Sequence, residues 1–368
     1  MAPFELDDDQ RALRATVRDF AGEAFSEAEV RRLMAGPSGL ERPVWERMAT
    51  ELGLQGLMVP EQHGGAGAGF VELAIVIEEL GRRLAPAPFL STALATLAIT
   101  GADAPDDAIG EHLAAIAEGR RVAAVAVAED DGRWDADGVR CAASTVDGGS
   151  RIDGAKSYVA DGLIADLLVV AARGEDGPGL YLVEADAPGL TRSALEVFDP
   201  TRRLARLELQ AVPALRLSGP EGVDRFLDRA RVAVAAEQVG GADLALSMAV
   251  EYAKERVQFG RPIGSFQAIK HMCADAYVDV ESARSAAYYG AWAIDEGSPE
   301  LTTVAPLAKA FCSETFVEVA MTNMQVHGGI SFTYEHPAHL YFRRARSGAQ
   351  LWGSPQSQRD LLATRIGL

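Results

Sequence analysis

The chain has 368 residues, of which 48% are hydrophobic and 24% charged, and this size and composition suit two or three soluble domains. Its formal net charge of -18 makes nucleic acid and anionic membranes unexpected partners, because both repel an acidic surface. An acidic start without signal-peptide features, and no apolar run long enough for a membrane span, predict a cytoplasmic protein. Cys141, Cys273 and Cys312 are scattered, and His336 and His339 lack a third ligand, so no metal site is expected.

Residues 1–118 are predicted to be helical. Asp7 or Asp8 can cap the first helix, which should run through Asp19 and beyond. The glycine-rich stretch 56–69 lacks the Lys-Ser/Thr pair of a P-loop, so we do not expect it to bind nucleotide phosphate. Further helices are expected at 45–52, 70–84, 93–100 and 107–118.

Residues 119–220 change in character. Short apolar runs alternate with Gly and Asp turns, which is typical of a β-sandwich or barrel and not of a βαβ fold. Strands are expected at 122–128, 138–142, 154–159, 167–172, 179–183 and 205–209.

The helical period returns from Asp228. Apolar residues from Val232 to Ala253 recur at alternating spacings of three and four, which predicts a long helix packed on other helices. A second long helix follows, then a third with Leu307 and Phe311 facing inward, and a fourth after Pro337 or Pro355. The sequence therefore predicts an α+β protein with a helical domain (1–118), a β domain (119–220) and a four-helix bundle (221–368).

The first candidate binding segment, Tyr252–Lys270, joins the first two helices of the bundle. Arg256 can make paired hydrogen bonds to a pyrophosphate, and Phe259 can pack on a flat ring. A solvated arginine and a core phenylalanine are the alternative. The spacing to three further residues favours the binding interpretation: Ile263, Phe266 and Gln267.

The second candidate segment, Gln325–Phe332, follows the third helix. The side-chain amide of Gln325 and the bare backbone N–H groups of Gly328 and Gly329 suit a phosphate and ribose contact. A plain helix C-cap with two glycines is the alternative. His327 has no carboxylate, serine or cysteine partner nearby in sequence, so a catalytic imidazole is not favoured.

Together these segments resemble the acyl-CoA dehydrogenase family, with its R-x-x-F-G-x-x-I-x-x-F-Q stretch and its Q-x-x-G-G loop. The stretch 56–69 resembles that family's V-P-E-x-x-G-G-x-G loop near the acyl cavity. The resemblance implies FAD as cofactor, an acyl-CoA as substrate, α,β-dehydrogenation, and an electron-transfer flavoprotein or similar acceptor. It also implies the same order of helical domain, β domain and four-helix bundle.

Three departures from the family pattern bear on function. Trp352 stands where the resembled family has its catalytic glutamate, and an indole has no basic lone pair with which to take a proton. Some members carry the glutamate on the helix that opens the bundle, where this chain has Ala230. Ala128 and Ala160 replace hydroxyl residues that would bond the isoalloxazine ring.

The resemblance then implies three possible functions. The first is the base-lacking subunit of a heteromeric acyl-CoA dehydrogenase, assembled as α2β2 with a sister subunit and resembling the actinobacterial pairs that act on bulky CoA thioesters such as steroid side chains. In that case Arg256, Phe259, Gln325, Gly328 and Gly329 complete the FAD site of the sister subunit. The second is a self-sufficient flavoenzyme with another base or an oxygenase reaction. The third is a non-catalytic scaffold without flavin.

Overall fold

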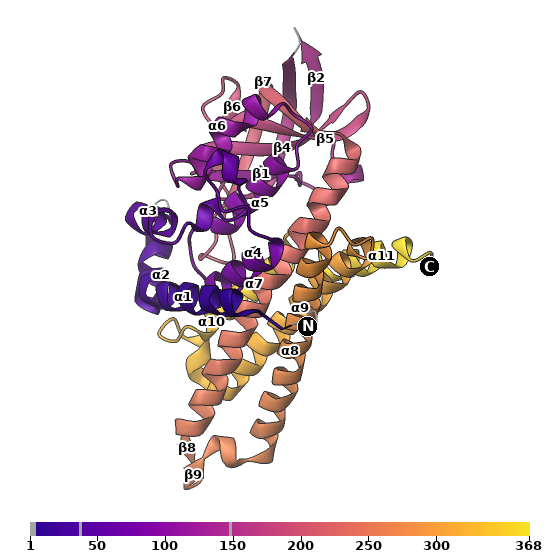
Figure 1. Cartoon of the computed structure of the whole chain (residues 1–368). Helices are drawn as coiled ribbons and strands as arrows, with labels where there is room; N and C mark the ends of the chain where they lie inside the picture. The colour runs from indigo at the N-terminus through magenta and orange to yellow at the C-terminus, as the bar shows by residue number, and fades with distance from the viewer. Residues whose placement is uncertain (1–4, 37–38, 147–148) are drawn as a thin grey trace. The chain divides into compact units, whose positions relative to one another are not determined.

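The computed structural model describes residues 5–36, 39–146 and 149–368 (Figure 1). The first four residues of the acidic start lie outside the described residues. The chain divides into two compact units. Unit 1 comprises Met1–Arg31, Phe70–Ala85 and Arg231–Leu368, and unit 2 comprises Arg32–Gly69 and Pro86–Ala230.

Unit 2 contains a seven-stranded sheet in the order β1-β4-β2-β3-β7-β5, with β6 paired to β7. Strand β5 also pairs with β4, so β4, β2, β3, β7 and β5 close into a barrel. Most neighbouring strands are antiparallel, while β1 and β4 are parallel. The strands are β1 (Ala123–Ala126), β2 (Ala142–Val146), β3 (Gly149–Ala160), β4 (Leu167–Gly174), β5 (Gly177–Glu184), β6 (Leu190–Ala194) and β7 (Leu204–Ser218).

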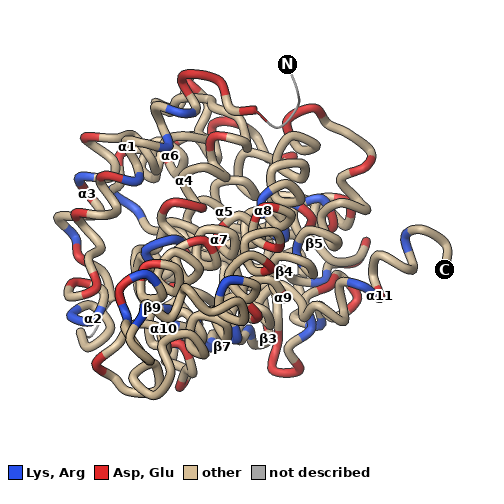
Figure 2. The backbone as a smooth tube through the Cα atoms, turned by 90° about the horizontal axis from the view of Figure 1, so that it is seen from below, with Lys and Arg blue, Asp and Glu red and all other residues tan. Residues whose placement is uncertain are grey.

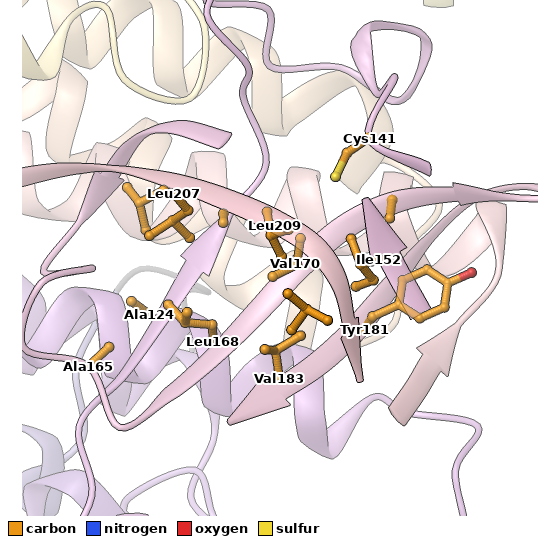
Figure 3. Close-up of a cluster of buried hydrophobic side chains, with 14 of the residues drawn as sticks. Ala124, Cys141, Ile152, Ala165, Leu168, Val170, Tyr181, Val183, Leu207 and Leu209 are labelled. Carbon is orange, nitrogen blue, oxygen red and sulfur yellow. The ribbon is translucent and has the colours of Figure 1, made fainter. Parts of the chain in front are cut away.

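The barrel core follows the two-residue period of its strands. Leu168 and Val170 on β4 point to the same face and pack with Ile152 on β3 and Leu207 on β7, as Figure 3 shows. The β4 residues between them are buried as well, because β4 is covered on both faces. This explains why the sequence of β4 is a continuous apolar run and not an alternating one.

Two expectations for the strands were wrong. The strand expected at 138–142 begins only at Ala142, the first residue of β2, because Asp135 accepts a hydrogen bond from Gly138 N (2.7 Å) and turns the chain into a short 3-10 helix, Ala136–Gly138. Strand β6 was not predicted. Its sequence, Leu-Thr-Arg-Ser-Ala, is mostly polar because β6 pairs on one side only, with β7.

In the described part of the chain, three helices of unit 2 precede the barrel. They are α3 (Arg42–Thr50), α5 (Phe89–Thr100) and α6 (Asp106–Ala117). The predicted helices at 45–52, 93–100 and 107–118 overlap these three. Trp45 anchors α3, because its indole donates a hydrogen bond to Gly119 O at 2.9 Å. Helix α2 (Glu27–Ala35) joins the two units along the chain.

Unit 1 is helical. Its helices are α1 (Asp8–Ala24), α4 (Phe70–Arg82), α8 (Gln267–Asp295), α9 (Leu301–His327), α10 (Ala338–Gly348), α11 (Pro355–Arg365) and most of α7 (Pro220–Glu255). Asp7 caps α1 as expected, accepting from Gln10 N at 2.8 Å. Helix α7 begins at Pro220 and not near Asp228, since proline is well tolerated in the first helical turn. Figure 1 shows α7, α8 and α9 running side by side.

Small residues form the centre of this bundle. Ala235 and Val239 on α7 pack with Ala283 and Ala287 on α8, and with Ala308 and Cys312 on α9. The predicted stripe on α7 is buried along its length. Helix α4 also approaches α7 so closely that a Cβ added to Gly240 on α7 would lie 1.9 Å from the carbonyl oxygen of Glu78 on α4.

The prediction that Leu307 and Phe311 face inward was wrong. Their exposed fractions are 47% and 36%, whereas Ala305, Ala308 and Cys312 form the buried face of α9. Apolar character alone did not identify that face, because the close contact between helices selects residue size. Leu307 and Phe311 lie on the outer side of this part of α9.

The predicted α+β architecture is confirmed, with N-terminal helices, a middle β barrel and C-terminal helices. The boundaries of the three domains stay a prediction. Within the described residues, none of the helices combines the length and apolar character needed to cross a membrane. Acidic and basic positions are interspersed along the chain in Figure 2, so the acidic excess is spread over many elements.

Candidate functional site

The first candidate segment is a tight hairpin at the end of α7. Helix α7 closes with a hydrogen bond from Arg256 N to Tyr252 O (2.8 Å), and β8 (Val257–Gln258) then pairs with β9 (Arg261–Pro262). Phe259 and Gly260 form the turn with φ values of 54° and 76°, the left-handed pair that a two-residue hairpin requires. This geometry presents the Phe259 side chain outward, with 92% of it exposed.

The second candidate segment is the turn that ends α9. Gly328 adopts φ 66° and ψ -143°, a backbone conformation that is essentially confined to glycine. A Cβ added to Gly328 or Gly329 would have no neighbour within 4 Å, so both glycines border open space. The Ser331 hydroxyl donates to Met324 O (2.9 Å) or to Gly328 O (2.7 Å) and holds the turn closed.

The ends of α7 and α9 lie together. Ala249 and Ala253 on α7 pack against Val326 on α9, and the Tyr252 ring stacks on the His327 ring with centroids 4.3 Å apart. Arg256 and the Gly328 turn therefore follow two helix ends that are in direct contact. The two segments, distant in sequence, form one surface.

The residues on this surface suit the phosphate end of FAD. Arg256, Gln325 and Gly329 are all exposed. They offer a fixed cation, a side-chain amide and accessible backbone, which together match an anionic pyrophosphate. Phe259 adds an exposed aromatic face. Their role toward flavin stays a prediction.

Unit 2 gives a poor fit for the flavin ring at the positions that the family pattern assigns to it. Ala128 follows β1 fully buried, and its carbonyl accepts a hydrogen bond from Ser157 N at 2.9 Å. Ala160 ends β3. Neither methyl group can bond the polar edge of an isoalloxazine ring. Hydrogen bonds from Arg206 and Ser157 occupy the neighbouring Asp130 carboxylate and lower its pKa to about 2.

Trp352 occupies a strained turn between α10 and α11. Its φ is 63°, which is a genuine outlier for a bulky residue, and only 7% of the residue is exposed. The Trp352 carbonyl accepts from Gln358 Nε2 at 3.2 Å, and a Cβ added to Gly353 would meet that nitrogen at 2.1 Å. The Gln358 side chain therefore holds the turn at both Trp352 and Gly353. The turn carries an indole where the family pattern has its base.

The other candidate positions supply no evident base either. Ala230 is fully buried and carries only a methyl group. Glu237, further along α7, is buried and forms an ion pair with Arg344 at 3.3 Å. The Glu237 carboxylate is therefore engaged by a buried arginine.

Sequence reasoning missed a buried lysine next to this turn. Lys309 on α9 is fully buried, and its ammonium donates to Ser313 Oγ (3.0 Å), Gly348 O (3.1 Å) and Ala349 O (3.1 Å). Gln238 on α7 also donates to Gly348 O, at 3.2 Å. Burial lowers the pKa of Lys309 to about 7.

The Lys309 cluster, comprising Lys309, Ser313 and Gln238, fixes the C-terminal carbonyls of α10. Those carbonyls immediately precede the Trp352 turn. The signal was present in the sequence, because Lys309 lies between Ala308 and Ala310 in the stretch that the helical period places near the core. A lysine there predicts either a partner for its charge or a set of helix-end acceptors.

Comparison with known proteins identifies the family. The acyl-CoA dehydrogenase N-terminal domain model matches residues 7–119, and the C-terminal domain model matches residues 218–367. The acyl-CoA dehydrogenase IpdE2 of Mycobacterium tuberculosis is 36% identical over 355 residues, covering 95% of this chain and 94% of that protein.

Two solved structures of multi-chain assemblies are similar over nearly the whole chain. One is a variant of the Tcur3481-Tcur3483 steroid ACAD, with 33% identity, a TM-score of 0.91 and 98% of each chain covered. The other is the ChsE4-ChsE5 complex from Mycobacterium tuberculosis, with 27% identity, a TM-score of 0.91, and 99% of this chain and 98% of that one covered. The resemblance seen in the sequence is confirmed. The chain belongs to the acyl-CoA dehydrogenase family, flavoprotein oxidoreductases whose cofactor is FAD.

Proposed function

We propose that this chain is the base-lacking subunit of a heteromeric acyl-CoA dehydrogenase, and that it completes the FAD site of a sister subunit. One observation carries the proposal: Trp352 stands in a buried turn, at the position that the family pattern assigns to the catalytic glutamate. The phosphate-contact residues, by contrast, match the family motif and are exposed. The positions that would act on a substrate or on the subunit's own flavin ring, such as Trp352 and Ala128, differ from the family pattern. The exposed positions that would contact a neighbouring subunit's FAD, such as Arg256 and Gln325, match it.

The chemistry explains why this difference matters. Dehydrogenation removes a proton from the α-carbon of the acyl-CoA while a hydride leaves the β-carbon, and bound FAD supplies the hydride acceptor. The α-proton is weakly acidic, so its removal requires a carboxylate within hydrogen-bond reach. The side chains of Trp352 and Ala230 cannot accept it. The sister subunit therefore provides the glutamate and the face of the flavin ring.

The outer surface of the bundle supports an assembly of unlike chains. Helices α8 and α9 expose apolar side chains that a monomeric bundle would normally bury. These residues are Tyr277, Val278, Leu307, Phe311 and Met321. We propose an α2β2 heterotetramer, in which such residues are covered by other subunits.

The relatives support both the assembly and the substrate class. The Tcur3481-Tcur3483 steroid ACAD and the ChsE4-ChsE5 complex each combine two named components. We propose a CoA thioester of a bulky, steroid-like acyl group as the substrate. An electron-transfer flavoprotein or similar acceptor would reoxidise the flavin, as the family membership implies.

Purification with and without the sister chain tests the proposal. The chain alone should be colourless and inactive, and co-expression with an acyl-CoA dehydrogenase encoded beside it should give a yellow, active complex. A dye-linked dehydrogenation assay measures turnover. A yellow, active homotetramer of this chain alone would instead establish a self-sufficient flavoenzyme. A colourless chain that no partner activates would establish a scaffold.

A further inference from the structure

Three aromatic side chains form a stack at the end of the bundle. The His327 ring lies between Tyr252, at a centroid distance of 4.3 Å and an interplanar angle of 29°, and His336, at 4.2 Å and 43°. The three residues come from three elements: the last turn of α7, the last residue of α9, and the segment that leads into α10. We call them the Tyr252–His327–His336 stack.

The stack connects both candidate segments. Arg256 follows one helical turn after Tyr252 and donates its backbone N–H to the Tyr252 carbonyl. Gly328 follows His327 directly and opens the second segment. A movement of either ring therefore changes the position of one segment relative to the other. The Ala253–Val326 contact is the adjoining apolar support.

Hydrogen bonds define the state of one ring nitrogen in each histidine. His327 Nδ1 lies 2.9 Å from the carbonyl oxygen of Asn323, so it carries the proton and donates. His336 Nδ1 accepts from Ala338 N at 3.2 Å, so it is unprotonated. Ala338 is fully buried and is the first residue of α10. A proton on His336 Nδ1 would leave this buried amide without its acceptor, at an appreciable cost.

The surroundings also oppose protonation. Burial lowers the pKa of His327, against the hydrogen bond to Asn323 O, which acts to raise it. Burial also lowers the pKa of His336, and the proximity of His327 lowers it further. Two residues of α2 have opposite effects on the pKa of His336: Glu27 raises it and Arg31 lowers it.

Two further groups belong to this neighbourhood. Burial lowers the pKa of His339, next along α10, and the nearby Arg343 lowers it further. The Tyr334 ring packs against the His339 ring at 5.1 Å and under the Arg343 guanidinium at 5.6 Å. The folded state thus prefers uncharged imidazoles throughout this cluster.

We propose that the Tyr252–His327–His336 stack is a positioning element that keeps the segments 256–260 and 325–330 ordered together and releases both when acid protonates its imidazoles. The sign follows from the lowered pKa values: the contribution is complete above the ordinary histidine pKa of about 6.5 and is lost as the pH falls below it. That these segments hold FAD rests on the proposed function. Their mutual ordering does not.

Hydrogen–deuterium exchange on the full chain, read at segments 252–260 and 325–333, tests the coupling without flavin or substrate. Protection factors corrected for intrinsic exchange should fall in both segments between pH 8 and pH 5.5, by about three- to tenfold for the loss of an aromatic pair. The double variant His327→Phe/His336→Phe keeps three rings but cannot gain a proton, so its protection should not fall in acid. His271→Phe, at an exposed position on α8, should behave as wild type.

A second variant tests the connection across the helices. Tyr252→Leu should lower protection at 325–333 already at pH 8, although residue 252 lies on the other helix. The proposal is overturned if only one segment responds to acid, if the double Phe variant still loses protection, or if Tyr252→Leu leaves 325–333 unchanged. Failure of FAD to bind would refute the proposed function and leave these exchange results valid.

Discussion

Replacing Lys309 with methionine tests whether a buried, partly charged lysine holds the Trp352 turn. The substitution keeps an unbranched apolar side chain, one atom shorter, and removes three hydrogen bonds, to Ser313, Gly348 and Ala349. Gly348 O and Ser313 keep their contacts with Gln238. The Ala349 carbonyl loses its Lys309 donor, which costs about 1–3 kcal/mol for a buried acceptor.

The pH dependence gives a larger and more specific effect. Burial lowers the pKa of Lys309 from 10.5 to about 7, so between those values the unfolded chain binds a proton that the folded chain lacks. The free energy of unfolding therefore rises with pH, by up to about 1.4 kcal/mol per unit. From pH 6.5 to pH 9.5 the wild type should gain about 3 kcal/mol relative to Lys309→Met, which has no such group.

Denaturant unfolding of both proteins at the two pH values measures this difference. Lys254→Met is the control, since Lys254 is an exposed lysine of the same unit and its loss should leave the pH dependence unchanged. A difference between wild type and Lys309→Met that stays constant across this pH range would refute the reasoning. So would an equal change in the Lys254→Met control.

Three further predictions concern the proposed complex. Arg256→Ala should weaken FAD retention about tenfold or more, because a charge-assisted contact contributes about 1.5–3 kcal/mol; a titration with FAD checks this, and unchanged retention contradicts the assignment. The double variant Leu307→Glu/Phe311→Glu should dissociate the tetramer in light scattering without unfolding unit 1, because both side chains are already exposed; a monomeric wild type with its partner present would contradict the assembly. Trp352→Ala should leave most of the activity of the complex, whereas loss of the sister chain's glutamate should abolish it; complete inactivity of Trp352→Ala with FAD still bound would overturn the base-lacking role.

Much of the architecture could be predicted from local patterns. The stripe from Val232 to Ala253 specifies its buried face because three-and-four spacing repeats over many turns. The end of α7 and the Gly328 turn were predicted because left-handed turns require particular residues. The order of helices, barrel and helices followed from the change from helical spacing to short apolar strand runs and back to helical spacing.

Two features could not be predicted from the sequence: which apolar residues are small enough for a close helix contact, and which polar groups meet over a long distance in the chain. Leu307 and Phe311 were assigned to the core because apolar character does not reveal how closely two helices approach. The acceptors of Lys309 lie at positions 348 and 349, far along the chain, and no local pattern connects them. The same holds for the contact of Tyr252 with His327, although each residue lies in a candidate segment.

In the first half of α9, the small residues Ala305, Ala308 and Cys312 are buried, while Leu307 and Phe311 point outward. In the proposed complex, the positions that pack the bundle interior and the positions that contact another subunit are therefore different positions on the same helix. A change at 307, 311 or 321 alters which surface is offered to another chain and leaves the interior intact. A change at 305, 308 or 312 has the reverse effect. Under the proposed function, two sister chains can thus share one interior and still distinguish self from partner, through substitutions that do not disturb folding.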